Sequence, residues 1–405
     1  MSGRCAIARF AATITIAAWL AACTPGIDVA VVQDATHASP GALYSIEPLG
    51  TYPALVLRAL IAWRGLTDRF PTSYGFSLYR VRYWTVGVDA RPTVASGLIA
   101  FPRTDSWRGV VSFQHGTESE RASAPSTPDP SNGILTAAAF AGRGYLLVAP
   151  DYIGLGASTE RHPYLHAETE ARAVIDLLRA AQSVVAAAGK RWPTTLLLTG
   201  FSQGGHATLA AQRALEADAA DGLVVAAAAP IAGPFDLAAV SFPFALEGHA
   251  RASSLYLAYM LSAYSDAYRE PLASALREHY ASIVPGLFDG AHDGEAIFAA
   301  LPAQPREMFN DDFLASYEQG DHNWLRERLA ENSLFEWSPR APIRLYFGSR
   351  HGDVSPAEAR LESERLRARG GDVTIVDVGD VDHEGSVLAA APLLLAWFDA
   401  LTERR

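Results

Sequence analysis

Short apolar runs alternate along most of the chain with stretches of helical spacing. Apolar and polar residues alternate over residues 77–86 and 93–100, as in strands that expose one face. Continuous apolar runs predict buried strands at residues 110–113, 145–149, 196–199, 223–229, 343–347 and 373–378. Helical spacing predicts helices over residues 167–188, from about residue 205, over 356–369 and near residue 387. Buried strands that alternate with helices indicate an α/β fold, with a mostly parallel central sheet flanked by helices.

One long interval breaks this alternation. Residues 236–339 contain no obvious buried strand, and Tyr, Phe and Leu recur there with helical spacing. We therefore expect an inserted helical cap, which divides the core into residues 49–235 and 340–405. Four tyrosines of the interval are expected to pack between helices, with substrate lining as the alternative. They are Tyr256, Tyr259, Tyr264 and Tyr268.

The first residues have the features of a targeting segment. Arg4 and Arg9 supply positive charge, and the apolar stretch over residues 10–20 is too short to span a bilayer. Leu20-Ala21-Ala22-Cys23 then resembles the lipobox of bacterial lipoproteins. This resemblance implies that residues 1–22 are removed as a signal peptide and that Cys23 is lipidated. An ordinary secretory signal is the alternative.

A tether is expected after the anchor. Residues 24–48 are small and polar without a sustained period, so residues 23–48 would form the lipidated cysteine and a linker. Two or more acyl chains hold a protein firmly on a membrane. Thr24 follows Cys23 where an Asp could stand, which in lipoprotein sorting favours the outer membrane. The expected product is an exported, membrane-anchored protein that faces the periplasm or the cell exterior.

Charge and cysteine content narrow the choice of partners. The formal net charge is −11, and the Lys and Arg residues are scattered, so no basic face attracts nucleic acid. Of the two cysteines, Cys5 lies in the segment expected to be removed, and Cys23 would be modified. Neither a disulfide nor a thiolate metal site is expected in the mature domain. The oligomeric state stays open.

A serine stands where a strand is predicted to meet a helix. Gly200-Phe201-Ser202-Gln203-Gly204 is a GxSxG sequence that follows the predicted strand at residues 196–199. Such a turn is tight and strained, so the glycines leave room for the neighbouring strand and helix while the serine projects into a cleft. Ser202 is therefore the candidate nucleophile. The backbone N–H of Gln203, at the helix start, is a candidate oxyanion donor.

A serine nucleophile needs a base that a third group orients, and on an α/β-hydrolase fold the chain order is Ser, acid, His. His383 follows the last predicted strand and is the candidate base. Asp353 follows the strand at residues 343–347 and is the candidate acid, which would accept a hydrogen bond from the imidazole. The alternative role for Asp353 is to cap the helix that enters at Pro356.

Two further loops would border the same site. Thr117, in the loop after residues 110–113, offers a backbone N–H as the second oxyanion donor, and Gly116 precedes it. His115 is expected to support this loop rather than to catalyse. Asp151 and Tyr152, at the end of another strand, are expected to buttress the rim.

These motifs resemble those of the secretory lipase family of α/β-hydrolases and related bacterial esterases. The resemblance extends from about Ser77 to the C-terminus and rests on His115-Gly116-Thr117, Pro150-Asp151-Tyr152, Gly200-Phe201-Ser202-Gln203-Gly204-Gly205-His206 and Asp382-His383. It implies hydrolysis of acyl esters, a helical cap between the sixth and seventh strands, and no cofactor. One position departs from the family pattern, because His351 stands where the catalytic Asp is usual. Asp380 or Asp382 could therefore replace Asp353 as the acid.

The expected function is that of a lipase or esterase, a carboxylic ester hydrolase that acts on a small-molecule or lipid ester. A peptidase or amidase of the same fold is the nearest alternative, because amide cleavage uses the same triad and oxyanion hole. A catalytically idle, membrane-tethered binding module is a second alternative, and an intact Ser202, His383 and oxyanion loop argue against it.

Overall fold

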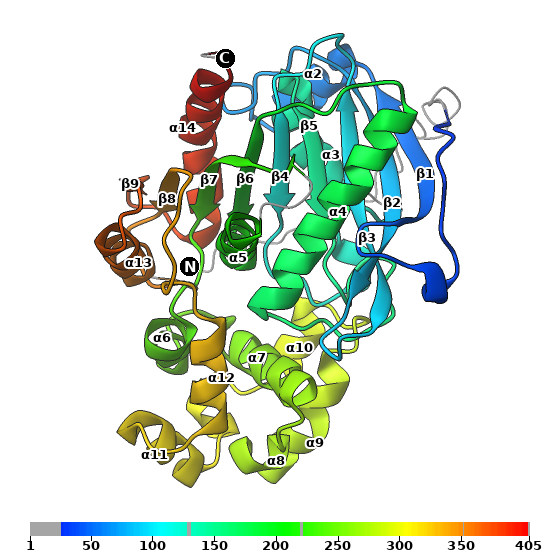
Figure 1. Cartoon of the computed structure of the whole chain (residues 1–405). Helices are drawn as coiled ribbons and strands as arrows, with labels where there is room; N and C mark the ends of the chain where they lie inside the picture. The colour runs from blue at the N-terminus through cyan, green and yellow to red at the C-terminus, as the bar shows by residue number, and fades with distance from the viewer. Residues whose placement is uncertain (1–25, 128–130, 219–221, 351, 404–405) are drawn as a thin grey trace.

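A nine-stranded sheet forms the centre of the molecule. A computed structural model describes residues 26–127, 131–218, 222–350 and 352–403, so the predicted signal segment and Cys23 lie outside the described residues. The sheet order is β1-β2-β3-β5-β4-β6-β7-β8-β9 (Figure 1). The strands are β1 (Leu43–Tyr52), β2 (Phe76–Val86), β3 (Pro92–Pro102), β4 (Val110–Gln114), β5 (Leu146–Pro150), β6 (Leu196–Phe201), β7 (Val225–Ile231), β8 (Ile343–Phe347) and β9 (Val373–Asp377).

The sheet changes from antiparallel to parallel pairing partway across. Strands β1, β2 and β3 pair antiparallel with each other, and β3 pairs antiparallel with β5. From β5 through β4 to β9 every pair is parallel. Strands β4 to β8 are buried on both faces, which is why continuous apolar runs located them in the sequence, whereas the edge strand β9 is largely exposed. The predicted α/β class with a mostly parallel sheet is confirmed.

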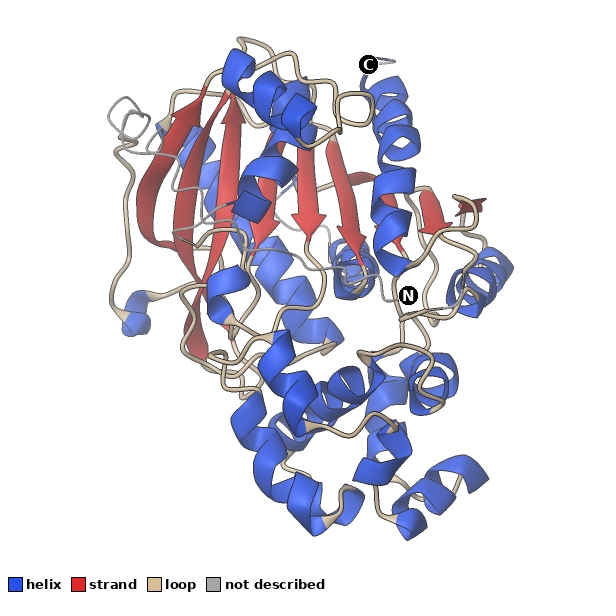
Figure 2. Ribbon diagram, turned by 180° about the vertical axis from the view of Figure 1, so that it is seen from behind, coloured by secondary structure: helices blue, strands red, loops and turns tan. Residues whose placement is uncertain are grey.

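Helices cover both faces of the sheet, as two opposite views show (Figure 1, Figure 2). One face packs on α4 (Ala167–Ala187), α5 (Gln203–Ala217) and α13 (Ala357–Ala368). The other face packs on α2 (Ala54–Trp63), α3 (Ser131–Phe140) and α14 (His383–Glu403). By length and composition alone α14 could cross a membrane, but its Leu394 and Phe398 are buried against this sheet.

Two predictions need correction. The tether expected over residues 23–48 ends sooner, because β1 begins at Leu43 and pairs with β2. Strand β1 is an edge strand with register shifts near Pro48 and Gly50, so its apolar alternation is broken in the sequence. The second correction concerns His383, which was expected in a loop before a helix near Val387. It is the first residue of α14.

The interval over residues 236–339, called the cap segment below, is helical in the structure and has its own apolar core. Residues buried in that core include Leu257, Leu261, Phe309 and Leu325. The segment lies below the ends of β4, β6 and β7 in Figure 1. It consists of a π-helical turn (Leu237–Ser241), α6 (Phe242–Leu246), α7 (Ser253–Tyr268), α8 (Leu272–Ala275), α9 (Glu278–Leu287), α10 (Gly294–Ala300), a 3₁₀ turn (Pro305–Met308), α11 (Asp311–Gln319) and α12 (Trp324–Asn332).

Candidate active site

Ser202 lies in a strained turn between β6 and α5. Its backbone has φ 57° and ψ −120°, a conformation that residues with a side chain rarely adopt. The turn is also tightly enclosed. A Cβ at Gly204 would lie 1.9 Å from the Gln114 carbonyl oxygen, and one at Gly200 would lie 2.2 Å from the Gly204 oxygen. Both positions therefore require glycine, and the turn holds Ser202 at the carboxyl edge of the sheet.

His383 contacts the Ser202 hydroxyl directly. Its Nε2 lies 2.9 Å from Ser202 Oγ, and its ring packs on Phe201 with 4.6 Å between ring centroids. Burial lowers the pKa of the His383 imidazole, and the charges of Asp353 and then Asp382 offset part of that effect. A lowered pKa keeps the imidazole neutral near pH 7. A neutral Nε2 can accept the proton of the serine hydroxyl.

Asp353 lies close to His383 but is bound by the cap segment. Its Oδ1 accepts a hydrogen bond of 2.8 Å from the hydroxyl of Tyr256 on α7. Among the described residues no hydrogen bond or ion pair joins Asp353 to His383, although the Asp353 charge raises the pKa of that histidine. The preceding Gly352 is adjacent to His383, because a Cβ there would lie 4.0 Å from the His383 Cβ. The loop is thus placed to bring a carboxylate to the imidazole.

The other two carboxylates considered for the acid have different partners. Asp382 Oδ1 accepts from the Gly385 N–H at 2.9 Å, within the first turn of α14. Asp380 is exposed and pairs with Arg350 at 3.4 Å. Of the three carboxylates, Asp353 has the largest effect on the pKa of His383.

The two candidate oxyanion donors come from different elements. Gln203 is the first residue of α5, and the first N–H groups of a helix have no acceptor within the helix. Thr117 follows β4, and its Oγ1 lies 2.8 Å from the Tyr164 hydroxyl, which fixes the loop. Gly116 brings this loop against Ser202, because a Cβ at Gly116 would lie 3.7 Å from the Ser202 Cβ.

The residues expected to support the rim make a buried hydrogen-bonded cluster. His115 Nδ1 donates to the Gly116 carbonyl at 2.7 Å, and its Nε2 lies 3.2 Å from the Asp151 carbonyl. The Asp151 carboxylate accepts from the Ser126 N–H at 2.9 Å and is fully buried. Tyr152 donates to the His115 carbonyl at 3.1 Å. These contacts hold the loops after β4 and β5 together.

A second buried network lies beneath the turn that carries Ser202, and the sequence analysis missed its centre, Glu170. This side chain is 1% exposed, accepts from Gln203 Nε2 at 2.9 Å, and lies 2.6 Å from His206 Nδ1. Gln203 Nε2 also donates to His162 Nε2 at 2.8 Å, and burial lowers the pKa of His162 to about 4. His206 Nε2 donates to the Asn332 carbonyl in the cap segment. The network therefore connects the start of α5 to α4 and to the cap segment.

Glu170→Ala is expected to destabilise the protein by about 3 kcal/mol, because it leaves the buried polar groups of Gln203 and His206 without their acceptor. Glu168→Ala is the matched control on the same helix, since Glu168 is exposed and pairs with Arg172 at the surface. The control should change the free energy of unfolding by less than about 0.5 kcal/mol. Urea denaturation of both variants measures the difference, and equal effects would contradict a structural role for Glu170.

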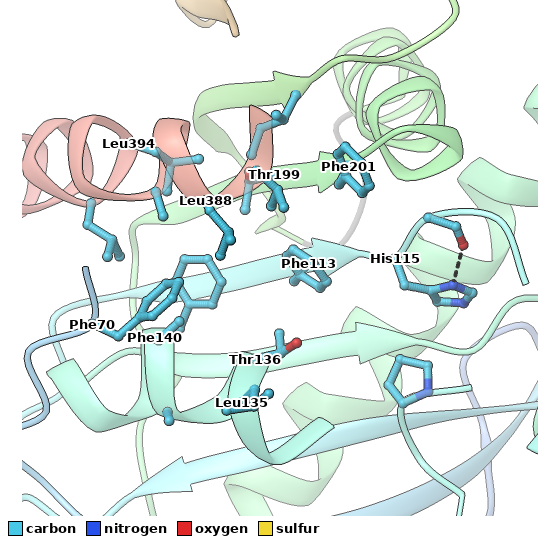
Figure 3. Close-up of a pocket in the computed structure, with 18 of the residues that line it drawn as sticks. Phe70, Phe113, His115, Leu135, Thr136, Phe140, Thr199, Phe201, Leu388 and Leu394 are labelled. Atoms are coloured by element: carbon cyan, nitrogen blue, oxygen red, sulfur yellow. Dashed lines mark hydrogen bonds between the residues drawn. The ribbon is translucent and has the colours of Figure 1, made fainter. Parts of the chain in front are cut away.

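A mostly apolar cavity of about 330 Å³ lies beside the turn that carries Ser202, with Gly116 and Phe201 in its lining. His115 lies at one end of it, and Phe70 and Leu394 lie at the other (Figure 3). Phe113 and Phe201 line it from the sheet.

As for metals, no group of three or more His, Cys, Asp or Glu side chains that could hold an ion occurs in the described part of the chain.

The fold, with its serine at a strand-to-helix turn, is that of an α/β-hydrolase, and solved structures show the same architecture. A candidate hydrolase from Legionella pneumophila is 28% identical with a TM-score of 0.80, over 89% of this chain and 97% of that chain. A ligand-bound form of the rice cell wall degrading esterase LipA from Xanthomonas oryzae is 27% identical with a TM-score of 0.78, over 90% and 98%. Candida antarctica lipase A in its closed state shares the fold, at 14% identity and a TM-score of 0.68, over 92% and 85%.

The chain belongs to the secretory lipase family, which it matches over residues 132–404. It is a carboxylic ester hydrolase of the lipase and esterase type. A second match, to the periviscerokinin family, spans only residues 95–104, most of them in β3, and is too short to indicate a family. No curated protein matches the chain.

Proposed function

We propose that the chain cleaves carboxylic esters through an acyl-enzyme on Ser202, with His383 as general base and Asp353 as the orienting acid. The observation that carries this proposal is the 2.9 Å contact between His383 Nε2 and Ser202 Oγ at a strained turn. Ser202 Oγ attacks the ester carbonyl carbon while its proton passes to His383 Nε2. The same proton then goes to the leaving alcohol oxygen, and the acyl group stays on Ser202.

Deacylation repeats the sequence with water. His383 takes a proton from the water, whose oxygen attacks the acyl carbon, and the acid leaves as Ser202 Oγ regains a proton. In each half-reaction the tetrahedral oxyanion is held by the N–H groups of Gln203 and Thr117. One such donor contributes on the order of 3 kcal/mol to the transition state.

Asp353 would fix the imidazole by accepting from its Nδ1. Among the described residues Tyr256 binds Asp353 through Oδ1, and Oδ2 has no hydrogen bond there that would keep it from the histidine. The proximity of Gly352 to His383 means that a small loop movement would complete this contact. The cap segment, residues 236–339, would then position the acid through Tyr256. We therefore propose that this segment contributes to the active site as well as covering it.

Inactivation by a fluorophosphonate tests the mechanism. These reagents phosphonylate an activated serine, so ester hydrolysis should fall to zero as one equivalent binds per chain. Pre-incubation with a slowly hydrolysed ester should protect the enzyme, because both reagents compete for Ser202. Full ester turnover after stoichiometric treatment would overturn the proposal.

We also propose that Cys23 anchors the protein to a membrane after residues 1–22 are removed. Support comes from the lipobox-like Leu20-Ala21-Ala22-Cys23 and from membership of a family of secretory lipases, which indicates export. Cys23→Ser is expected to shift the protein from the detergent phase of a Triton X-114 partition to the aqueous phase, or to leave it unprocessed. Cys5→Ser is the matched control and should partition as the wild type does. Unchanged detergent partitioning of the Cys23 variant would contradict the anchor.

A further inference from the structure

Helix α2 is apolar on two sides, and one of these sides faces solvent. The inner side is buried against the sheet through Leu57 and Ile61. On the other side, called the outer face below, five exposed apolar residues follow the i, i+1, i+4, i+7, i+8 spacing of a single helix face. They are Leu55, Val56, Ala59, Ala62 and Trp63. The side chain of Leu55 is 77% exposed and that of Trp63 is 76% exposed, so large apolar groups stand in water at both ends of the outer face.

Positive charge surrounds the outer face, although the formal net charge of the chain is −11. Residues 53–70 contain three arginines and a single acid. Arg58 and Arg69 donate to backbone carbonyls, and Arg64 lies 5.4 Å from the centre of the Trp63 ring. In the described part of the chain none of the three arginines pairs with a carboxylate. Their charges are therefore available to an anionic partner.

The outer face is too small to hold a second copy of the chain. Ten residues make a helix about 15 Å long, and a face about 10 Å wide then offers on the order of a few hundred Å². A stable protein dimer buries about 800 Å² on each partner. A bilayer surface has no such size requirement. Helices that lie on bilayers bury apolar side chains at the headgroup boundary, where Trp is favoured, and direct Arg toward the anionic lipids.

The start of the folded chain lies at the same end of the molecule as α2. The segment before β1, dark blue in Figure 1, begins in the upper part of that view, and α2 also lies there. Gly26 is the first described residue, and the proposed lipid anchor at Cys23 precedes it by three residues. An extended chain spans at most about 3.5 Å per residue, so the anchor is within roughly 10 Å of Gly26. The anchor therefore brings this end of the molecule to the membrane.

We propose that the outer face of α2 docks on the surface of an anionic phospholipid bilayer, the membrane that carries the anchor. The inference rests on the proposed anchor for the identity of that membrane, whereas the exposed apolar residues and the arginines are independent of it. The cap segment lies at the opposite end of the molecule from α2 (Figure 1, Figure 2). Docking through α2 therefore orients the cap segment away from the bilayer, and the ester reaches Ser202 from the aqueous side.

Spin labels on the full-length, lipidated protein test this contact. Residues 24–405 contain no cysteine, so Ala59→Cys introduces one labelling site on the outer face, and Asp312→Cys introduces a matched, exposed site on α11 of the cap segment. The labelled proteins are reconstituted into vesicles of phosphatidylcholine and phosphatidylglycerol. Collisions with oxygen, which concentrates in lipid, and with a water-soluble nickel chelate report where each label lies. The ratio of oxygen to nickel collisions should be roughly fivefold higher for Ala59→Cys than for Asp312→Cys.

Substitutions on the outer face should lower this ratio in the Ala59→Cys chain. Trp63→Ser removes an exposed apolar side chain and Arg64→Glu reverses a charge, so each should lower the ratio by roughly twofold or more. Val224→Ser is the matched control, because Val224 is an apolar residue outside α2 that is 64% exposed, and it should leave the ratio unchanged. The effect of Arg64→Glu should disappear in vesicles of phosphatidylcholine alone. Hydrolysis of p-nitrophenyl acetate at the wild-type rate checks that each variant is folded.

The docking face and the anchor fail in different ways. A ratio for Ala59→Cys no higher than that for Asp312→Cys would overturn the docking face while the protein stays in the detergent phase. Dipolar broadening between the Ala59→Cys labels of two copies would overturn it in favour of a second copy of the chain. A high ratio for Asp312→Cys would contradict the orientation. Failure of the anchor has its own signature, because the wild-type chain would then take up label at Cys23.

Discussion

Ser202→Ala is expected to lower kcat for ester hydrolysis by on the order of 10⁵-fold, the largest effect of any substitution considered. The variant keeps the oxyanion donors and the apolar cavity, so it should still bind substrate and retain a small rate above that in water. It lacks the oxygen that forms the acyl-enzyme, and His383 Nε2 loses its partner at 2.9 Å. Initial rates with a p-nitrophenyl ester measure the loss.

Ser254→Ala is the matched control for removal of a buried serine hydroxyl. Ser254 is buried in the cap segment and donates to the Pro302 carbonyl at 2.6 Å, away from the nucleophile. Its removal should cost about 1 kcal/mol of stability and leave kcat within about twofold. Wild-type turnover by Ser202→Ala would show that another residue is the nucleophile.

Asp353→Asn is expected to lower kcat by roughly 10⁴-fold, because an amide at this position favours the wrong tautomer of the imidazole and does not stabilise the imidazolium. Asp380→Asn and Asp382→Asn are the controls, one exposed beside Arg350 and one bonded within α14. Their effects should be far smaller. Near-native turnover by Asp353→Asn, with a large loss in Asp382→Asn, would transfer the role of the acid to Asp382.

The same variant should change the dependence on pH. Burial lowers the pKa of His383 below its usual value of about 6.5, and the Asp353 charge raises it. Activity needs the neutral imidazole, so kcat/KM falls as the pH drops through this pKa. Without the negative charge the pKa of His383 falls further, and the residual activity of Asp353→Asn should persist to lower pH. An acid limb that moves to higher pH would contradict this electrostatic role.

The parallel core and the tight turn at Ser202 were predictable because local chemistry dictates them. Buried parallel strands have to be apolar on both faces, and the turn at Ser202 cannot form unless Gly200 and Gly204 leave room for the backbone. Strand β1 was missed because an edge strand with irregular register lacks strict alternation. The long-range pairing with β2, rather than local pattern, makes it a strand.

Contacts between distant segments were the least predictable part of the site. The bond between Tyr256 and Asp353 joins residues 97 positions apart, and helical spacing alone favours packing for that tyrosine. The sequence around Glu170 does, however, indicate that this carboxylate is buried. It lies on one helical face with Ala167, Ala171 and Val174, all buried, and a carboxylate among apolar neighbours indicates a partner elsewhere in the fold.

The most direct test of the central claim is to locate the fluorophosphonate adduct by peptide mass spectrometry. We expect a single modified peptide that contains Ser202, in an enzyme that has lost its ester hydrolysis. The Asp353→Asn variant should label more slowly at the same residue, because its histidine is a poorer base. An adduct on a different serine, or an inactivated enzyme with Ser202 unmodified, would contradict the account.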